Sequence, residues 1–340
     1  MARIPVIILF GPTASGKTAV LLNLFSASLS CPAELISADS MQVYRGMDIG
    51  TAKPSAEERA RLPHHLIDIR DPGEQFNAGD FVRLAEDACR DISGRGRIPV
   101  ISGGTGFYIK NFIMGLPEAP PSDPRIRAQL RAELAERGAQ SLMDELASVD
   151  PAGARRIHIN DTYRLLRALE VPRLCGRPLS SFPASGGTPL EAAGNRPSFR
   201  FLITALSRPR EELYRRINTR CDSMFDRGLP AEVRRLFDAG YSPKDPGLRA
   251  IGYREFFVEE PDDEGGGVKY RLSRDIDGVK ALVAQNSRRY AKRQLTFFTG
   301  IPNVKWLEAG GDEEATARLL RREMDEFLAA RSCPMHTLPT

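Results

Sequence analysis

The chain has 340 residues and a formal net charge of +4, with 41% hydrophobic and 27% charged residues. This length suits about two domains, and the composition is ordinary for a globular protein with enough apolar residues for a core. No apolar run approaches the roughly 18 residues of a membrane helix, so we expect no membrane partner. The small net charge does not by itself indicate a nucleic-acid partner, and the five widely spaced cysteines form no Cys-x-x-Cys pair that would predict a disulfide framework or a zinc site.

The first half of the chain alternates apolar runs with helical stretches. Residues 4–10 form a continuous apolar run, which is typical of a strand buried on both faces of a parallel sheet. Gly11 and Pro12 follow directly, so this start predicts a strand and a loop, not a signal peptide, and a cytoplasmic location. The further elements that we expect here are a helix over 17–29, a strand over 35–38, a helix over 78–91 and a strand over 98–102. This alternation predicts an α/β fold, with a parallel sheet flanked by helices.

A second pattern begins after residues 116–124, which contain four prolines. From about 124 to 176 the apolar spacing is helical, and a loose Gly/Pro/Ser/Ala stretch over 178–197 precedes a returning strand at 199–206. We therefore predict that residues 1–119 and 199–340 form the α/β core and that 120–198 form a mostly helical insertion. In the rest of the core we expect helices over 210–225, 230–239 and 279–298, and a flexible surface loop over 262–267.

The clearest chemical signal is a phosphate-binding loop that fits G-x-x-x-x-G-K-[ST] between the first strand and the first helix. It consists of Gly11, Pro12, Thr13, Ala14, Ser15, Gly16, Lys17 and Thr18. In such a loop the backbone N–H groups surround a phosphate, the lysine reaches the outer phosphate and the hydroxyl is placed to bind Mg²⁺. The expected ligand is phosphorylated, and a nucleoside triphosphate is the default. Against that default, no acidic residue follows the strand at 98–102, and no Asn-Lys-x-Asp motif is present.

Four further segments, taken with this loop, resemble the tRNA dimethylallyltransferase family across nearly the whole chain. They are residues 39–54, residues 103–108, residues 156–171, and residues 250–254 together with 292–296. The resemblance implies a P-loop-type sheet whose loop binds the diphosphate of dimethylallyl diphosphate instead of ATP. It also implies transfer of the dimethylallyl group to the N6 amine of the adenine 3′ of the anticodon (position 37) in tRNA, with release of diphosphate.

The resemblance also suggests roles for individual residues. Asp39 corresponds to the family's general base and to a contact of hydrated Mg²⁺, Thr105 to a residue that positions the reacting centre, and Arg220 to a contact of the donor diphosphate, while Lys17 and Mg²⁺ would stabilise the leaving group. The tRNA-binding residues that we expect, with 120–198 gripping the anticodon stem-loop, are Asp39, Ser40, Met41, Gln42, Thr105, Arg127, Tyr163, Arg164, Leu165, Leu166, Arg167, Arg249, Gly252, Tyr253, Arg254, Lys292, Arg293 and Gln294. The chain departs from the family pattern at Phe297 and Thr299, where related sequences tend to have Trp and Arg, so tRNA docking there is open.

Three alternatives stay open at this point. A small-molecule or nucleotide kinase would share the loop and the sheet, but such chains are mostly shorter and lack a basic helical insertion. A prenyltransferase acting on free adenine nucleotide would share the chemistry but would not need the insertion, and a non-catalytic RNA-binding module would not need Gly16-Lys17-Thr18. A monomer is the default oligomeric state.

Overall fold

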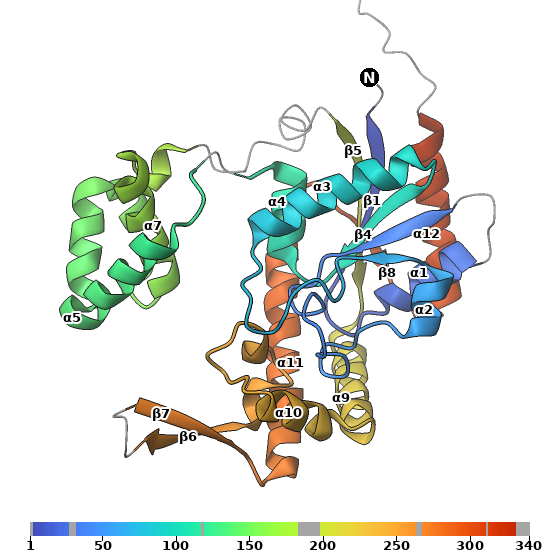
Figure 1. Cartoon of the computed structure of the whole chain (residues 1–340). Helices are drawn as coiled ribbons and strands as arrows, with labels where there is room; N and C mark the ends of the chain where they lie inside the picture. Colours follow the sequence, from blue (N-terminus) through green and yellow to red (C-terminus); the bar gives the residue numbers. More distant parts are fainter. Residues whose placement is uncertain are drawn as a thin grey trace, which may run out of the picture. The chain divides into compact units, whose positions relative to one another are not determined.

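The computed structural model describes residues 3–26, 32–116, 119–182, 198–262, 267–310 and 312–330. The chain folds as two compact units, of which the first combines Met1–Ile113 with Ala193–Thr340 and the second is Met114–Ala192. The two units are drawn together in Figure 1 and are described separately below.

The first unit is built on a six-stranded parallel sheet (Figure 1). In spatial order its strands are β3 (His64–His65), β2 (Ala33–Ser37), β4 (Ile98–Gly103), β1 (Ile4–Phe10), β5 (Phe199–Ser207) and β8 (Lys305–Glu308). The register aligns Phe10 with Gly103 and Ser37 with Ser102, so the loops after β1, β2 and β4 leave the same edge of the sheet. The expected α/β class with a parallel sheet is confirmed.

Helices cover this sheet because the strands are apolar on both sides. The helices of the first unit are α1 (Lys17–Ser26), α2 (Ala56–Arg61), α3 (Ala78–Gly94), α4 (Gly106–Met114), α9 (Arg210–Asp226), α10 (Leu229–Asp238), α11 (Ile276–Phe298) and α12 (Glu313–Ala329). Ile7 and Leu9 lie in one core cluster with side chains of α1 and α12, which pack against each other (Figure 1). Strand side chains alternate, so Ile8 and Phe10 face the opposite side, where the Phe10 ring lies 4.8 Å from that of Phe298 in α11.

The sequence analysis did not predict the two strands on either side of the expected loop over 262–267. They are β6 (Phe257–Asp262) and β7 (Gly267–Leu272), which form an antiparallel hairpin, and residues 263–266 of the loop lie outside the described residues. The predicted end of the first helix, residues 27–29, also lies outside them, and α1 is described to Ser26.

The second unit is helical. Its elements are α5 (Pro124–Val149), α6 (Pro151–Ala154), α7 (Thr162–Cys175) and a 3-10 turn (Leu179–Ser181). Gly138, with φ of 76°, breaks α5 into two segments, which lets both pack against α7 around leucines at positions 130, 142, 146, 165 and 169. The insertion that we expected spans 120–198, whereas this unit spans Met114–Ala192, and the stretch 183–197 lies outside the described residues.

Candidate active site

The phosphate loop turns sharply between β1 and α1. Ala14 and Gly16 both have left-handed backbone conformations, with φ of 62° and 96°. This conformation is unfavourable for a residue with a side chain, so Ala14 must be held in place by its surroundings. The Lys17 ammonium folds back on the loop and donates to the carbonyl oxygens of Gly11 and Pro12, each at 2.9 Å.

A cavity of about 970 Å³ opens beside this loop, within the first unit. It lies where β1, β2 and β4 end, so residues far apart in the sequence meet there. Its walls include predicted site residues from three segments, namely Lys17 and Thr18, Asp39 to Gln42, and Arg220. The structure therefore brings together the residues proposed for donor binding and catalysis, and it adds Tyr290, which the sequence analysis did not assign to the site.

Two cations in this cavity have little compensation from the protein. Burial, and after it the nearby Arg220 charge, lowers the pKa of Lys17 to about 7, and the Asp39 charge partly opposes this shift. Burial also lowers the pKa of Arg220, and Asp39 again opposes this effect. Among the described residues, no group forms a hydrogen bond or ion pair with Arg220. Lys17 is held only by the two carbonyl oxygens of its own loop, and no described carboxylate forms an ion pair with either cation, so this part of the cavity suits an anionic ligand.

Asp39 presents one carboxylate oxygen to the loop and one to the cavity. Its Oδ1 accepts the backbone N–H groups of Met41 (2.9 Å) and Gln42 (3.3 Å), and no described residue donates to Oδ2. The Thr105 hydroxyl accepts the Ser40 N–H at 2.9 Å, which fixes the same turn from β4. The Asp39 carboxylate and the Thr105 hydroxyl therefore hold the same turn, and Asp39 lines the cavity there.

Tyr290 of α11 lies next to this point. Burial and the Asp39 charge raise the pKa of its phenol to about 12, and the nearby Arg293 charge, followed by the Gln294 and Thr105 side chains, partly opposes the shift. The phenol therefore stays protonated and can donate a hydrogen bond in the cavity. The sequence signal for it was weak, because Tyr290 stands in a basic helical run whose side chains could equally face solvent.

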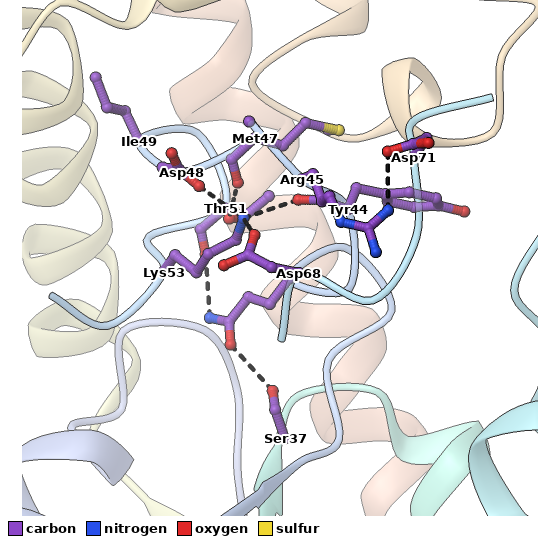
Figure 2. Close-up of polar contacts among 12 residues, drawn as sticks. Ser37, Tyr44, Arg45, Met47, Asp48, Ile49, Thr51, Lys53, Asp68 and Asp71 are labelled. Atoms are coloured by element: carbon purple, nitrogen blue, oxygen red, sulfur yellow. Dashed lines mark hydrogen bonds and ion pairs between the residues drawn. The ribbon is translucent and has the colours of Figure 1, made fainter. Parts of the chain in front are cut away.

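The loop that carries Asp39 to Gln42 is anchored by a buried lysine (Figure 2). Lys53 Nζ donates to the Tyr44 carbonyl oxygen at 2.8 Å and forms ion pairs with Asp48 (2.6 Å) and Asp68 (2.5 Å). The Gln42 amide donates to the backbone oxygens of Thr51 and Ala52, both at 3.3 Å, and its oxygen accepts from the Ser37 hydroxyl. Gln42 thereby connects the end of β2 to this anchored loop, while its side chain also lines the cavity.

A buried carboxylate holds the same loop from the other side. Glu232 of α10 accepts the backbone N–H groups of Asp48, Ile49 and Gly50 at 2.9–3.1 Å and the Tyr253 hydroxyl at 2.6 Å. Burial, together with the Glu232 charge, raises the pKa of Tyr253 well above its usual range. Tyr253 is fully buried, so the RNA contact that we expected of its side chain is not available in this structure. Gly252 is buried as well, whereas Arg249 and Arg254 are exposed on the cavity rim.

The basic segment of α11 divides in a similar way. Lys292 and Arg293 are exposed, as RNA contacts require. Gln294 is buried, and its amide accepts the Thr13 N–H at 2.9 Å and donates to the Gly104 carbonyl oxygen at 2.8 Å. Its side chain therefore connects the phosphate loop to the loop after β4 and has no free surface for RNA.

The expected RNA residues of the second unit are mostly internal. Leu165 and Leu166 are core residues, and their side chains cannot reach RNA in this fold. Arg127 and Arg167 both pair with the fully buried Glu170 at 2.9 Å. The other two expected residues, Tyr163 and Arg164, are exposed. The Tyr163 ring stacks on the Arg127 guanidinium. Among the described residues, Arg164 forms an ion pair only with Asp161, the N-cap of α7.

Within the described ranges, no three His, Cys, Asp or Glu side chains are close enough to form a metal site of their own. Thr18 and Asp39 nevertheless line one cavity, and Mg²⁺ is commonly held by one or two protein oxygens together with phosphate and water. No helix in the described part of the chain has the length and apolar character needed to cross a bilayer.

Comparison with known proteins identifies the family. The model of the protein family described as IPP transferase matches residues 42–300 of this chain. A tRNA dimethylallyltransferase of Geobacter sulfurreducens is 44% identical over 90% of this chain and 93% of its own length. A tRNA dimethylallyltransferase of Syntrophotalea carbinolica is 42% identical over 96% and 97%.

Solved structures of similar fold point to the same family. The full-length tRNA isopentenylpyrophosphate transferase of Bacillus halodurans matches with a TM-score of 0.65 and 36% identity, covering 97% of this chain and 98% of that one. A eukaryotic dimethylallyltransferase acting on tRNA has the same fold, with a TM-score of 0.74 at 24% identity over 98% and 82% of the two chains. With a family model that covers most of the sequence and relatives above 40% identity, the chain belongs to the IPP transferase family.

Proposed function

We propose that this chain transfers the dimethylallyl group of dimethylallyl diphosphate to the N6 amine of adenine 37, 3′ of the anticodon, in tRNA and releases diphosphate. The observation that carries the proposal is the meeting of Lys17, Arg220 and Asp39 in one cavity beside the phosphate loop. The two cations suit a diphosphate, and the carboxylate suits a nucleophile that must lose a proton. The names of the relatives, tRNA dimethylallyltransferase, favour this substrate pair.

The proposed reaction is a substitution at the allylic carbon of the donor. The adenine amine forms a bond to C1 of the dimethylallyl group while the bond from C1 to the bridging oxygen breaks. The electron pair of that bond stays on the diphosphate, where Lys17 and Arg220 stabilise the growing negative charge. Asp39 Oδ2, which no described residue occupies, accepts the proton that the amine loses.

Mg²⁺ fits this site as a ligand of the donor. Thr18 and Asp39 would hold it with the diphosphate oxygens, and it would supply further neutralisation of the leaving group.

Recognition of tRNA requires an unstacked adenine and contacts to the phosphate backbone. A base amine inside an RNA loop can be reached only when the base leaves its stack and enters a pocket. Exposed cations at Arg164, Arg249, Arg254, Lys292 and Arg293 are suited to phosphate contacts with the anticodon stem-loop. In this proposal the protein is a cytoplasmic monomer that binds tRNA without a partner protein.

The kinase alternative has less support. A P-loop kinase would share the parallel sheet and the phosphate loop, but β4 is followed by Gly103, Gly104 and Thr105 instead of an acidic residue that could organise Mg²⁺ around ATP. The relatives that cover most of the chain are named for transfer to tRNA and not for phosphorylation.

The test is to incubate the protein with radiolabelled dimethylallyl diphosphate and, separately, tRNA, AMP or no acceptor, and to repeat the tRNA reaction with Asp39→Asn. We expect label in tRNA only, and a single-turnover rate at least about 10²-fold lower for the variant, with tRNA affinity little altered. Asp71→Asn, at an exposed carboxylate, serves as the control. Label in AMP would exclude the tRNA substrate, and a variant restored by extra Mg²⁺ would make Asp39 a metal ligand instead of the base.

A further inference from the structure

Side chains from the second half of the chain contact three consecutive residues of the phosphate loop. Gln294 accepts the Thr13 N–H at 2.9 Å. Arg216 Nε donates to the Ala14 carbonyl oxygen at 3.0 Å, and Arg208 Nε donates to the Ser15 carbonyl oxygen at 2.8 Å. The loop that would bind the donor is therefore fixed from outside, by residues about 200 positions away in the sequence.

Both arginines converge on one carboxylate at the start of α12. Arg216 Nη2 lies 3.0 Å and Arg208 Nη2 3.6 Å from Glu313 Oε1. Arg208 is further fixed by Glu212 at 2.5 Å and by the Gly310 carbonyl oxygen at 2.8 Å, and its side chain is fully buried. Glu313 thus holds the Arg216 guanidinium directly and lies next to that of Arg208, which Glu212 and the Gly310 carbonyl oxygen hold as well.

These contacts act on the strained part of the loop. Ala14 is left-handed, with φ of 62°, and both groups of its following peptide are held: its carbonyl oxygen by Arg216, and the Ser15 N–H by the Pro12 carbonyl oxygen at 3.2 Å. In a planar trans peptide the C=O and N–H groups point in opposite directions. Because Arg208 holds the Ser15 carbonyl, it directs the Gly16 N–H to the opposite side of the loop, and Gly16 is one of the residues that line the cavity.

A side chain at Gly16 would crowd Arg208. A Cβ atom there would lie 3.1 Å from Arg208 Nη2, and the residue has a φ of 96°. The guanidinium group therefore packs directly behind the loop.

We propose that Arg208, Arg216 and Glu313 are positioning residues that hold the phosphate loop in its diphosphate-binding conformation, so that the start of α12 contributes to donor affinity. This inference rests on the proposed function of the loop. Arg208 and Glu313 do not line the cavity, whereas Arg216 does, so variants of Glu313 test the positioning role most directly. Loss of Glu313 should weaken donor binding and leave tRNA binding unchanged, because the loop, and not the RNA surface, is released.

The test compares Glu313→Ala with Glu314→Ala. Both changes remove an acidic residue from the first turn of α12. Glu313 pairs with Arg216, whereas Glu314 is exposed and, among the described residues, forms an ion pair only with Arg318 on the surface. For each variant we would measure the Kd for inorganic diphosphate with Mg²⁺ by calorimetry, the KM for dimethylallyl diphosphate, kcat, the Kd for tRNA and the thermal unfolding midpoint.

For Glu313→Ala we expect the diphosphate Kd and the donor KM to rise about tenfold, which corresponds to about 1.4 kcal/mol, with the tRNA Kd within about twofold of the wild type. Glu313→Gln should restore most of the affinity, because its amide oxygen can still accept from Arg216. If Glu313→Ala does not fold, Arg216→Lys keeps the charge, cannot reach Ala14 and Glu313 together, and should show the same rise.

Two results would overturn the positioning role while the wild type still transfers the prenyl group. One is unchanged diphosphate affinity in folded Glu313→Ala and Arg216→Lys. The other is equal weakening by Glu313→Ala and Glu314→Ala, which would mean a general effect of charge at the helix start. A wild-type protein that neither binds diphosphate nor transfers the prenyl group would instead overturn the proposed function.

Discussion

Replacing Lys53 by methionine should destabilise the first unit strongly, although Lys53 lies in a loop. The Lys53 side chain is 2% exposed and its ammonium is shared by Tyr44, Asp48 and Asp68 (Figure 2). Methionine keeps most of the aliphatic volume and removes the charge and the three contacts. The change therefore tests the polar anchor and not the packing of the methylene groups.

The loss of unfolding free energy depends on which of the three partners can be hydrated once the lysine is gone. Removing one member of a buried ion pair costs about 3–5 kcal/mol, because the other charge is left buried. Here Asp48 and Asp68 are 56% and 34% exposed, so both can be hydrated after the change and the cost is smaller. The Tyr44 carbonyl oxygen is the group that stays buried without a donor, which costs about 1–3 kcal/mol. We expect a total loss of about 2–3 kcal/mol, most of it from the carbonyl oxygen; the hydrated carboxylates keep the total below the range for a fully buried pair.

The assay is thermal unfolding followed by circular dichroism, with Arg45→Met as the matched control. Arg45 pairs with Asp71 in the same loop, but both side chains are more than half exposed, so its loss should cost no more than about 1 kcal/mol. At about 2–4 °C per kcal/mol, Lys53→Met should lower the midpoint by about 5–10 °C and Arg45→Met by a few degrees at most. Equal midpoints for the two variants would refute the reasoning that burial makes the Lys53 contacts matter.

Three further predictions concern charge. First, burial is the main cause of the lowered pKa of Lys17 (about 7), so above that pH Lys17 must take up a proton when the donor binds. The KM for dimethylallyl diphosphate should therefore be lowest below pH 7 and rise by up to about tenfold per pH unit above it. Lys17→Arg should flatten this profile, because arginine stays charged. Second, Arg164→Ala should reduce the slope of log K for tRNA against log salt by about 0.7, whereas Arg167→Ala should mainly lower stability, as seen by comparing salt titrations with melting curves. Third, Glu170→Ala should cost the second unit about 3 kcal/mol or more, because it leaves Arg127 and Arg167 without their buried partner; calorimetry with the transition of the first unit as internal reference would measure this.

Glu170 should also make the stability of the second unit depend on pH in the acidic range. Burial alone would raise its pKa, but hydrogen bonds from Ser122 and Arg167 hold the pKa below its usual range. A depressed carboxylate pKa stabilises the fold above the unfolded pKa, and that stability is lost as the pH falls through the folded pKa. The second unit of the wild type should therefore melt earlier on acidification, and Glu170→Ala should lose this part of the pH dependence.

The sequence predicts the central strands well because they are continuous apolar runs with punctuating loops. It does not predict β3, which is two half-buried histidines, or β8, in which Leu307 is the sole buried side chain. Such short edge strands form because a neighbouring strand offers hydrogen bonds, which a sequence pattern does not contain. Helix α12 is different, since Ala317, Leu320 and Met324 have helical spacing, and that element could have been predicted.

The roles of the site residues were harder to predict than their locations. The motif places Lys17 and Thr18, and the segment that begins with Asp39 lines the same cavity. Sequence reasoning could not tell that Arg208 and Arg216 lie behind the phosphate loop, because this depends on contacts across nearly 200 residues of chain. Arg208 stands between β5 and α9 and Arg216 lies within α9, and neither position carries a sequence motif that would indicate such a contact.

Several segments that resemble the family turn out to be each other's packing partners. A Cβ atom on Gly50 would lie 2.5 Å from the Tyr253 ring, and one on Gly104 would lie 2.5 Å from the Gln294 amide. Each glycine therefore leaves space for a large side chain from a segment some 200 residues away, and each of those side chains is buried and hydrogen-bonded. At these positions the match to the family therefore reflects how the segments pack around the cavity. Gly50→Ala and Tyr253→Phe would distinguish the two: the first should displace the loop that Glu232 holds, whereas the second removes one hydrogen bond and leaves the shape intact.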